Sequence, residues 1–490
     1  MIAAAFVLCV AAILASAQRP VQAAGPGSES PSIWGLHVAW NQIWNGEGQV
    51  FRPTGVDRSG AEYPCVGGWG IWDGPVDRPA VAEIAQWHAN TVRIPLNEDC
   101  WLGINGVNPA LSGAGYRQAI EQYVSLLNQA NIAVVLDLHW NAPGTQQSKG
   151  QQPMADLDHA PSFWSSVAET FKGNSSVMFD LYNEPFTTSW ACWRDGSTAA
   201  GAGPCTDVPF AVAGMQTLVD AVRATGARNV ILLGGLRWAN NLTQWLAYEP
   251  TDPLHQVAAS FHVYNWNECI APTCFDSQLQ PVMERVPLVA TEMGEGNFAP
   301  AGIVDCGQQT FVDDVMNWLD LHGGGYLAWA WVPYGCGFPS LLADWNGTPS
   351  GMGQGVMNRL SALAAAGFQS YAAIDAGGGT TAYSIEYRTA RPLEGAVATM
   401  TLPAGTAVTV GAARADRWQV SVSQTAAATT VTFTQRPGTV LAPSFGYVPL
   451  SVRSSGASPA STTSPAFSIT ATTVPGGQQV TDQGLILSGE

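Results

Sequence analysis

Two glutamates follow short apolar runs and could form a catalytic pair. Glu184 comes after the run 177–181, and Pro185 next to it has no N–H to continue a β-ladder. Glu292 comes directly after the run 288–291. Such runs are typical of buried parallel strands, whose carboxyl ends carry the catalytic groups in barrel folds. Two carboxylates at one rim suit cleavage of a glycosidic bond, in which one protonates the leaving oxygen and the other attacks or stabilises the anomeric carbon.

Further polar and aromatic residues are predicted at the same rim. They are Arg93, His139, Trp140, Asn183, His262, Tyr264 and Trp331. Arg93 beside a carboxylate is expected to keep it ionised. Asn183 is expected to hydrogen-bond the sugar 2-hydroxyl, a contact that strengthens in the transition state. Tyr264 would orient the nucleophile, and Trp331 would form the floor under the reacting sugar. Glu295 is the alternative nucleophile.

The elements that must position these residues alternate between buried strands and helices. Strands are expected over 51–56, 91–95, 132–138, 177–181, 230–233, 257–261, 288–291 and 326–331. Helices are expected over 78–88, 116–130, 162–171, 208–225, 309–322 and 356–366, with a weaker one over 238–246. The count of eight strands favours an α/β fold of the (β/α)8 TIM-barrel type over a doubly wound open sheet.

The chain divides into four predicted segments. The apolar start, 1–24, reads as a signal peptide, although it lacks a basic beginning. Residues 25–367 form the barrel, and 368–452 hold short Val- and Thr-rich runs typical of a small all-β sandwich. Residues 453–490 are rich in Ser, Thr and Pro and are expected to be a tail.

Charge and cysteine content limit the partners. The formal net charge is −17 with only 20 Lys and Arg, which argues against nucleic acid or an anionic membrane surface. Outside Cys9 the eight cysteines are expected to pair in sequence order. Zinc is the alternative, but CxxC and HExxH spacings are lacking, so no metal or other cofactor is expected. No segment after the start is long enough for an integral membrane span, and we expect a secreted monomer.

The ordered set of rim residues resembles glycoside hydrolase family 5. The residues that carry the resemblance are Arg93, His139, Asn183, Glu184, Pro185, His262, Tyr264, Glu292 and Trp331. The resemblance covers roughly residues 33–366 and implies a retaining (β/α)8 glycosidase with Glu184 as acid/base and Glu292 as nucleophile. Met293 departs from it, because many relatives carry an aromatic residue after the nucleophile.

The 19 Trp offer flat apolar surfaces for sugar rings, which suits an oligo- or polysaccharide substrate, and the resemblance implies that this substrate is β-linked. The barrel is most similar to bacterial cellulases, which implies an endo-β-1,4-glucanase. The sandwich faintly resembles that of endoglycosylceramidases, so a glycolipid, a mannan or an exo-acting β-glycosidase activity is the alternative. A catalytically inactive sugar-binding relative is the alternative of another class.

Overall fold

The computed structural model describes residues 32–485 with gaps at 48–49, 187, 297–309, 336, 366–368, 378–379, 390–392, 411–417, 440, 442–443, 456–465 and 474–478. The predicted signal peptide therefore lies outside the described residues. No helix in these ranges is both long and apolar enough to cross a membrane.

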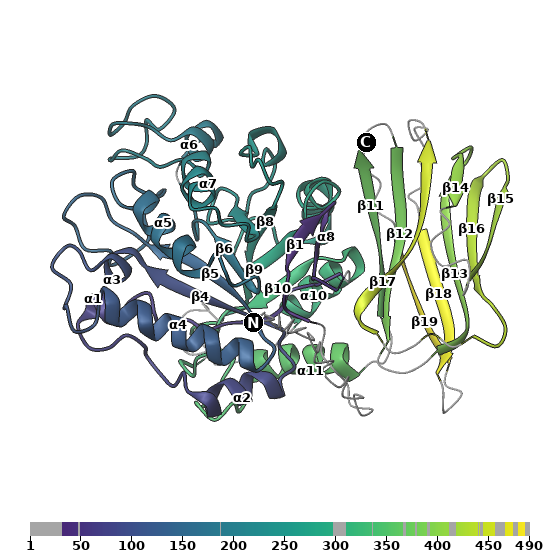
Figure 1. The fold of residues 1–490 in the computed structure, drawn as a ribbon, viewed down its shortest axis with the longest axis horizontal. Helices are drawn as coiled ribbons and strands as arrows, with labels where there is room; N and C mark the ends of the chain where they lie inside the picture. The colour runs from purple at the N-terminus through teal and green to yellow at the C-terminus, as the bar shows by residue number, and fades with distance from the viewer. Residues whose placement is uncertain are drawn as a thin grey trace, which may run out of the picture.

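Eight parallel strands close into a barrel, as predicted (Figure 1). They are β3 (Thr54–Asp57), β4 (Thr91–Asn97), β5 (Ala133–Trp140), β6 (Val177–Asp180), β7 (Ile231–Gly234), β8 (Val257–Tyr264), β9 (Leu288–Gly294) and β10 (Gly325–Ala328). The last strand, β10, pairs with β3 and closes the ring. Strands β5, β8 and β9 run further than predicted, so that His139, His262 and Glu292 lie within strands rather than after them.

Helices surround this barrel at nearly the expected positions (Figure 1). The long ones are α2 (Arg78–Gln86), α4 (Ala114–Gln129), α5 (Ala160–Phe171), α7 (Met215–Ala224), α10 (Thr310–His322) and α11 (Gly351–Ala365). Short helices lie in the loops: α1 (Pro64–Gly67), α3 (Glu98–Leu102), α6 (Trp190–Asp195), α8 (Pro272–Gln278) and α9 (Gln280–Met283).

Of the helix predictions, one is wrong in part and another is wrong. The helix expected from residue 208 begins only at Met215, because Val212 forms bridges with Asp156 and Ser197 and holds the preceding segment as a loop. The helix expected over 238–246 is absent, and only the 3-10 turn η1 (Leu246–Tyr248) follows. Arg237, Trp238 and Ala239 all have positive φ angles, which end any right-handed helix there.

The amino-terminal end of the barrel is covered by the hairpin β1 (His37–Ala39) and β2 (Gln42–Trp44). The N–H of Val38 donates to Gln256, which directly precedes β8, so the hairpin lies at the start of the strands. Its Ile43 is buried against residues inside the barrel. Trp34 and Trp40 lie at this end, away from the carboxyl ends of the strands.

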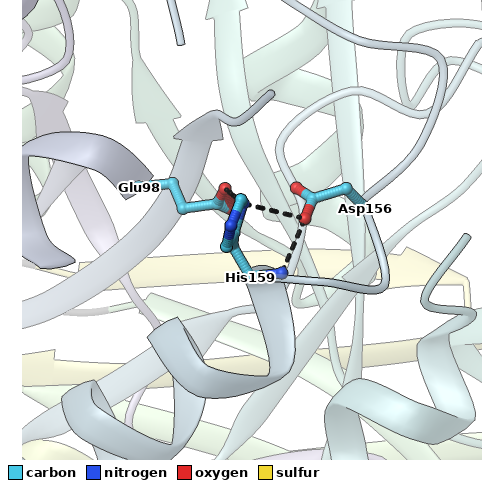
Figure 2. Close-up of side chains that lie close together, drawn as sticks. All are labelled: Glu98, Asp156 and His159. Carbon is cyan, nitrogen blue, oxygen red and sulfur yellow. Dashed lines mark hydrogen bonds and ion pairs between the residues drawn. The ribbon is translucent and has the colours of Figure 1, made fainter. Parts of the chain in front are cut away.

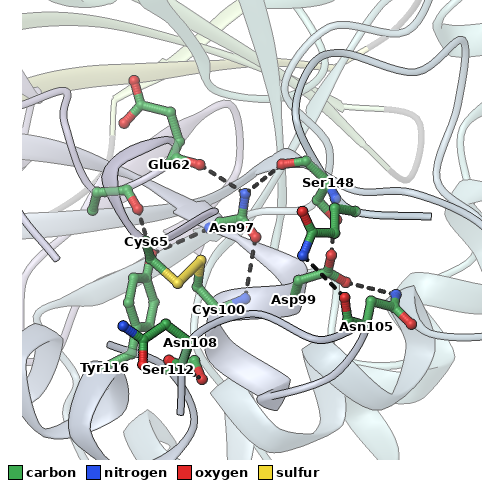
Figure 3. Close-up of a disulfide and its surroundings, with 12 residues drawn as sticks. Glu62, Cys65, Asn97, Asp99, Cys100, Asn105, Asn108, Ser112, Tyr116 and Ser148 are labelled. Atoms are coloured by element: carbon green, nitrogen blue, oxygen red, sulfur yellow. Dashed lines mark hydrogen bonds between the residues drawn. A yellow bond between two sulfur atoms is a disulfide. The ribbon is translucent and has the colours of Figure 1, made fainter. Parts of the chain in front are cut away.

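Three disulfides follow the predicted sequence order: Cys65–Cys100, Cys192–Cys205 and Cys269–Cys274. The remaining pair, Cys306 and Cys336, lies outside the described residues. The first disulfide joins α1 to α3 (Figure 3). Beside it, Asn97 accepts from the N–H of Cys100 and donates to the backbone oxygens of Glu62 and Ser148. Together these bonds fix the start of α3 at the carboxyl rim.

A second, all-β domain follows the barrel, as predicted (Figure 1). One antiparallel sheet has the order β11 (Gln369–Gly377), β12 (Thr380–Thr389), β17 (Ser444–Ser455) and β14 (Val408–Val410). The other has the order β15 (Trp418–Gln424), β16 (Ala428–Gln435), β13 (Leu393–Pro403), β18 (Ala466–Thr473) and β19 (Gln479–Leu485). Trp418 is buried between them, against Phe433, and is not a sugar-binding surface.

The predicted tail over 453–490 is wrong for residues 453–455, 466–473 and 479–485, which belong to strands. Strand β18 pairs with β13 along its length, and β19 pairs with β18. Phe467, Ile469 and Ala471 alternate along β18 and are all buried. This spacing of two is that of a strand with one face in a core. The many Ser and Thr residues between them concealed it, because they occupy the alternate positions.

Candidate active site

Glu184 and Glu292 converge at the carboxyl end of the barrel. Glu184 lies in the loop after β6, and Glu292 lies in β9. One carboxylate oxygen of each lies within 4.8 Å of the other and of a nitrogen of His262. Their side chains are 11% and 4% exposed, and both line the same cleft. Two nearly buried carboxyl groups therefore face one space that a ligand can enter.

Arg93, in β4, is the centre of a buried charge cluster behind Glu292. Its guanidinium donates to Glu292 Oε1 at 2.7 Å and to Asn183 Oδ1 at 2.8 Å. It also forms ion pairs with three aspartates inside the barrel. These are Asp57 at 3.2 Å, Asp137 at 3.1 Å and Asp180 at 3.1 Å. One cation thus serves four carboxyl groups, which can share it only if some of them are neutral.

The pKa values in this cluster indicate which groups are neutral. Burial raises the pKa of Asp57 well above its ordinary value, although Arg93 opposes the shift. Burial likewise raises the pKa of Asp180 to about 8. Burial lowers the pKa of His139, but the hydrogen bond and charge of Asp137 outweigh it and leave the value raised. Near neutral pH, Asp180 therefore favours its protonated form, and the raised pKa of Asp57 likewise favours the neutral carboxyl group.

Glu184 has different surroundings from Glu292. Burial raises its pKa to about 7, although the charge of His139 and a hydrogen bond from Gln151 lower it. His262 Nδ1 lies 2.9 Å from Glu184 Oε1, and its Nε2 lies 3.0 Å from Thr291 Oγ1. Burial lowers the pKa of His262 to about 4, so the ring is neutral and can donate only one proton. If Nδ1 carries that proton, His262 donates to Glu184 and accepts from Thr291.

Tyr264 completes the contacts of Glu292. Its hydroxyl donates to Glu292 Oε2 at 2.5 Å, while Arg93 binds the other oxygen. Each carboxylate oxygen of Glu292 therefore accepts a hydrogen bond from a different residue. These two contacts fix the plane of the carboxylate.

The sequence of the barrel matches a known family. The pattern of the cellulase family, glycosyl hydrolase family 5, matches residues 52–335, more than half of the chain. The chain belongs to this family. It is therefore a glycoside hydrolase with the family's (β/α)8 barrel.

Relatives of this family 5 hydrolase have two kinds of names. It is 22% identical over 320 residues to a mannan endo-1,4-beta-mannosidase of Salipaludibacillus agaradhaerens, covering 64% of this chain and 87% of that one. It is 22% identical over 339 residues to endoglucanase MaCel5A of a Microbulbifer species, covering 66% of this chain and 55% of that one. A beta-glucanase from Saccharophagus degradans, solved with cellotetraose, has the same fold, with a TM-score of 0.51 and 19% identity over 67% of this chain and 93% of that one.

Aromatic side chains line the cleft of the hydrolase. Trp329 stacks on His139 with ring centroids 5.3 Å apart and planes 3° apart. Trp266 stacks on Tyr264 with centroids 4.6 Å apart. Trp238 stacks on Phe186 with centroids 5.3 Å apart, and each of these Trp residues lines the cleft. Trp238 and Trp266 are each 46% exposed, so a sugar ring entering the cleft can reach both side chains.

The prediction that Trp331 forms the floor of the reacting subsite is wrong. Trp331 is buried and packs edge-on against Trp87, which follows α2, with ring centroids 4.6 Å apart. Trp329 lies at the cleft instead, directly after β10 ends at Ala328. Trp140 is half-buried beside Tyr63, with ring centroids 6.3 Å apart. Trp190 and Trp193 are buried in the core and are not available to a sugar.

Two residues of this site were missed in the sequence. Gln151 lies in the long loop between β5 and α5, where a lone Gln carries no recognisable signal. Trp329 lies two residues before Trp331, and both belong to the same predicted strand. The sequence pattern alone therefore does not show which of the two reaches the cleft. Glu295, the alternative nucleophile, accepts from the backbone N–H groups of Phe311 and Val312 and serves the start of α10.

Proposed function

We propose that this hydrolase cleaves internal bonds of a β-1,4-linked glucan with retention, using Glu184 as acid/base and Glu292 as nucleophile. The proposal rests on one observation: the carboxyl groups of Glu184 and Glu292 lie close together, but their hydrogen-bond and charge partners differ. Their oxygens lie within 4.8 Å, in keeping with the separation of about 5–5.5 Å between the carboxyl groups of retaining enzymes. Glu184 has a pKa near 7, while Glu292 is bound by Arg93 and Tyr264.

The reaction would proceed in two displacements. In the first, Glu292 attacks the anomeric carbon while protonated Glu184 gives its proton to the departing glycosidic oxygen. In the second, ionised Glu184 takes a proton from water, and that water displaces Glu292 from the sugar. A pKa near 7 suits a group that must give and then take a proton near neutral pH. Neutral His262 would hold Glu184 in place without adding a fixed charge.

Asn183 is suited to bind the sugar 2-hydroxyl. Its Oδ1 accepts from Arg93, which fixes the orientation of the amide. Its Nδ2 is buried and has no hydrogen-bond partner in the described structure. A buried donor left without a partner costs about 1–3 kcal/mol, which a substrate hydroxyl would recover. Glucose and mannose differ in the configuration at this hydroxyl, so Asn183 would also contribute to discrimination between the two sugars.

The aromatic side chains of the cleft and the disulfides support a polymeric substrate and secretion. The exposed faces of Trp238 and Trp266 suit successive sugars of a chain, which favours an endo-acting enzyme. A β-mannan is the second candidate, because a related sequence is named a mannan endo-1,4-beta-mannosidase. The three disulfides are typical of proteins outside the reducing cytosol and support secretion.

The experiment compares soluble cellulose, mannan, xyloglucan and a glycolipid with the purified enzyme. We expect cellulose to be cleaved fastest, and NMR of the first product to show the β-anomer. Glu184→Gln and Glu292→Gln should each lower the rate by at least about 100-fold. Glu295→Gln is the matched control and should retain activity. Cleavage of glycolipid alone would overturn the substrate proposal, and full activity of Glu292→Gln would overturn the assignment of the nucleophile.

A further inference from the structure

A second cluster of titratable side chains lies outside the catalytic cleft. It consists of Glu98, Asp156 and His159 (Figure 2). Glu98 is the first residue of α3, directly after β4. Asp156 lies in the loop 141–159 between β5 and α5, and His159 is the residue that precedes α5. The three side chains therefore join two successive rim segments, those that follow the neighbouring strands β4 and β5.

Glu98 carries a buried carboxyl group that the described chain does not satisfy. The residue is fully buried, and neither carboxylate oxygen has a hydrogen-bond partner of normal geometry. Burial raises its pKa well above the ordinary value, as do the neighbouring Asp156 and Asp99, and the nearby N–H of Ala142 offsets only part of this. No Lys or Arg among the described residues forms an ion pair with Glu98 or Asp156 that could compensate the charge.

His159 points its own unsatisfied nitrogen at the two carboxyl groups. Its Nδ1 has no hydrogen-bond partner, and it lies 3.6 Å from Glu98 Oε1 and 3.6 Å from Asp156 Oδ1. These separations are too long for hydrogen bonds. Ligands of a tetrahedral metal ion with bonds of about 2.0–2.1 Å lie about 3.4 Å from one another, which is close to these values.

We propose that Glu98, Asp156 and His159 bind a divalent cation that prefers mixed oxygen and nitrogen ligands, Mn²⁺ or Zn²⁺. Carboxylate oxygens suit Mn²⁺ and imidazole suits Zn²⁺, whereas Ca²⁺ and Mg²⁺ favour ligand sets made of oxygen alone. A dication would compensate the buried carboxylates and occupy the free Nδ1. His159 is 23% exposed on its side chain, which leaves a path for the ion to enter.

The surroundings of the cluster orient its ligands as metal sites require. Asp156 Oδ2 accepts from Asn141 Nδ2 at 2.7 Å, and its Oδ1 accepts from the backbone N–H of His159 at 2.8 Å. On the other side of the ring, His159 Nε2 lies 3.9 Å from Asp158. The two hydrogen bonds fix the plane of the Asp156 carboxylate, whereas the separation from Asp158 is too long for a direct hydrogen bond. Glu98 lies in the other rim segment, in α3. Its position is fixed by Asn97, which caps this helix, and by the Cys65–Cys100 disulfide beside it.

A cation here would tie the loop 141–159 to α3. This loop also carries Gln151, which reaches the cleft, and Asn141, whose Oδ1 accepts from the hydroxyl of Tyr182 at 2.9 Å. The ion would therefore act on the order of the loop rather than on the reaction itself. Its presence can be tested by binding and hydrogen exchange, whatever the substrate of the enzyme.

The test uses the full chain, stripped with a chelator and titrated with MnCl₂ or ZnCl₂ by calorimetry. We expect one ion per chain, a higher melting temperature and slower hydrogen exchange over residues 141–159. Glu98→Gln and Asp156→Asn should weaken binding at least tenfold, and Asn141→Ala by about 10–100-fold, as for other outer-shell partners. Glu169→Gln, an exposed acid on α5 paired with Lys172, is the control and should bind normally.

The catalytic carboxylates are the competing location, because Glu184, His262 and Glu292 also lie within metal-binding distance of one another. Binding that survives in Glu98→Gln but is lost in Glu184→Gln would overturn the proposal. Absence of saturable binding of either ion to the wild-type protein would also overturn it and indicate a proton shared between Glu98 and Asp156. If Glu98→Gln does not fold, His159→Gln replaces it, since that side chain is partly exposed.

Discussion

Gln151 Nε2 donates a hydrogen bond of 2.5 Å to Glu184 Oε2, so a residue from the loop after β5 contacts the proposed acid/base directly. This bond stabilises the ionised form of Glu184 and lowers its pKa, against the larger effect of burial. The loop that carries Gln151 can therefore set the pH range of the reaction without touching the sugar.

Gln151→Ala should shift the alkaline limit of activity to higher pH. Loss of the hydrogen bond destabilises ionised Glu184, so its pKa rises from about 7 and the acid remains protonated further into the alkaline range. The measurement is the dependence of kcat/KM on pH. Gln147→Ala is the control, because Gln147 lies in the same loop but donates to the backbone of Asn105. An unchanged alkaline limit in Gln151→Ala would contradict this role.

Tyr264→Phe should lower kcat by roughly 10–100-fold, because a hydrogen bond to a charged group contributes about 1.5–3 kcal/mol. The variant keeps the ring stacked on Trp266 and loses only the contact with Glu292. Steady-state kinetics on the preferred polysaccharide provide the measurement. Tyr116→Phe also loses a buried hydroxyl, one that donates to the backbone of Ala61, and should affect stability rather than kcat. Equal loss of kcat in both variants would argue against a specific role for Tyr264.

Trp329→Ala should weaken oligosaccharide binding, whereas Trp331→Ala should lower the stability of the fold. Trp329 lines the cleft, so its removal should weaken binding of an oligosaccharide, measured by calorimetry with a Glu184→Gln background. Trp331 is buried against Trp87, so its removal should cost about 3–5 kcal/mol of unfolding free energy. Denaturant unfolding measures the second effect. The reverse assignment of the two effects would restore Trp331 as the subsite residue.

Asp180→Asn should reduce the loss of stability at alkaline pH. Folding raises the pKa of Asp180 to about 8, so the protonated form is favoured in the folded state. Its contribution to stability is complete below the unfolded pKa of about 4 and is lost as pH rises through 8. The melting temperature should therefore fall less between pH 6 and 9 in the variant than in the wild type.

The matched control for that experiment is Asp252→Asn. Burial raises the pKa of Asp252, but the hydrogen bond and charge of Arg223, together with the backbone N–H groups of Gln256 and Leu254, outweigh this and leave the value lowered. Its contribution is therefore present above the unfolded pKa and lost at acid pH. Asp252→Asn should destabilise the protein at neutral and alkaline pH and should not flatten the alkaline limb. An identical profile for both variants would contradict the assignment to Asp180.

Ile469→Ala should destabilise the sandwich by about 2–5 kcal/mol, because it opens a cavity in a buried core. Ser468→Ala, the neighbouring position on the half-buried face of β18, should have little effect. Calorimetry of the full chain should show a lower transition for the sandwich and an unchanged one for the barrel. Equal stability of Ile469→Ala and the wild type would mean that β18 is not part of the folded core.

The sequence predicted most where one physical rule decides the outcome. All eight barrel strands were found because buried parallel strands are continuous apolar runs. Arg93, Glu184 and Glu292 were identified because few arrangements other than a catalytic rim bring such charges together. The predictions failed where the direction in which a side chain points decides its role. Trp329 and Trp331 have the same composition signal, and only the path of the chain after Ala328 decides which one faces the cleft.

The remaining failures have a common origin in long-range pairing. Gln151 reaches Glu184 across 33 positions, and no local pattern marks such a contact. Strand β18 lies in a segment whose Ser and Thr content is typical of a tail, and only pairing with β13 makes it a strand. In both cases the deciding energy comes from a partner elsewhere in the chain rather than from the segment itself.

The pairing of β18 also bears on the order in which the chain can fold. Strand β13 takes β16 on one side and β18 on the other, so its second edge stays open until residues 466–473 have been made. During synthesis the barrel can close once β10 has emerged, well over a hundred residues earlier. The nascent sandwich therefore exposes an unpaired edge, a site where strands of other chains could add, until β18 has been synthesised.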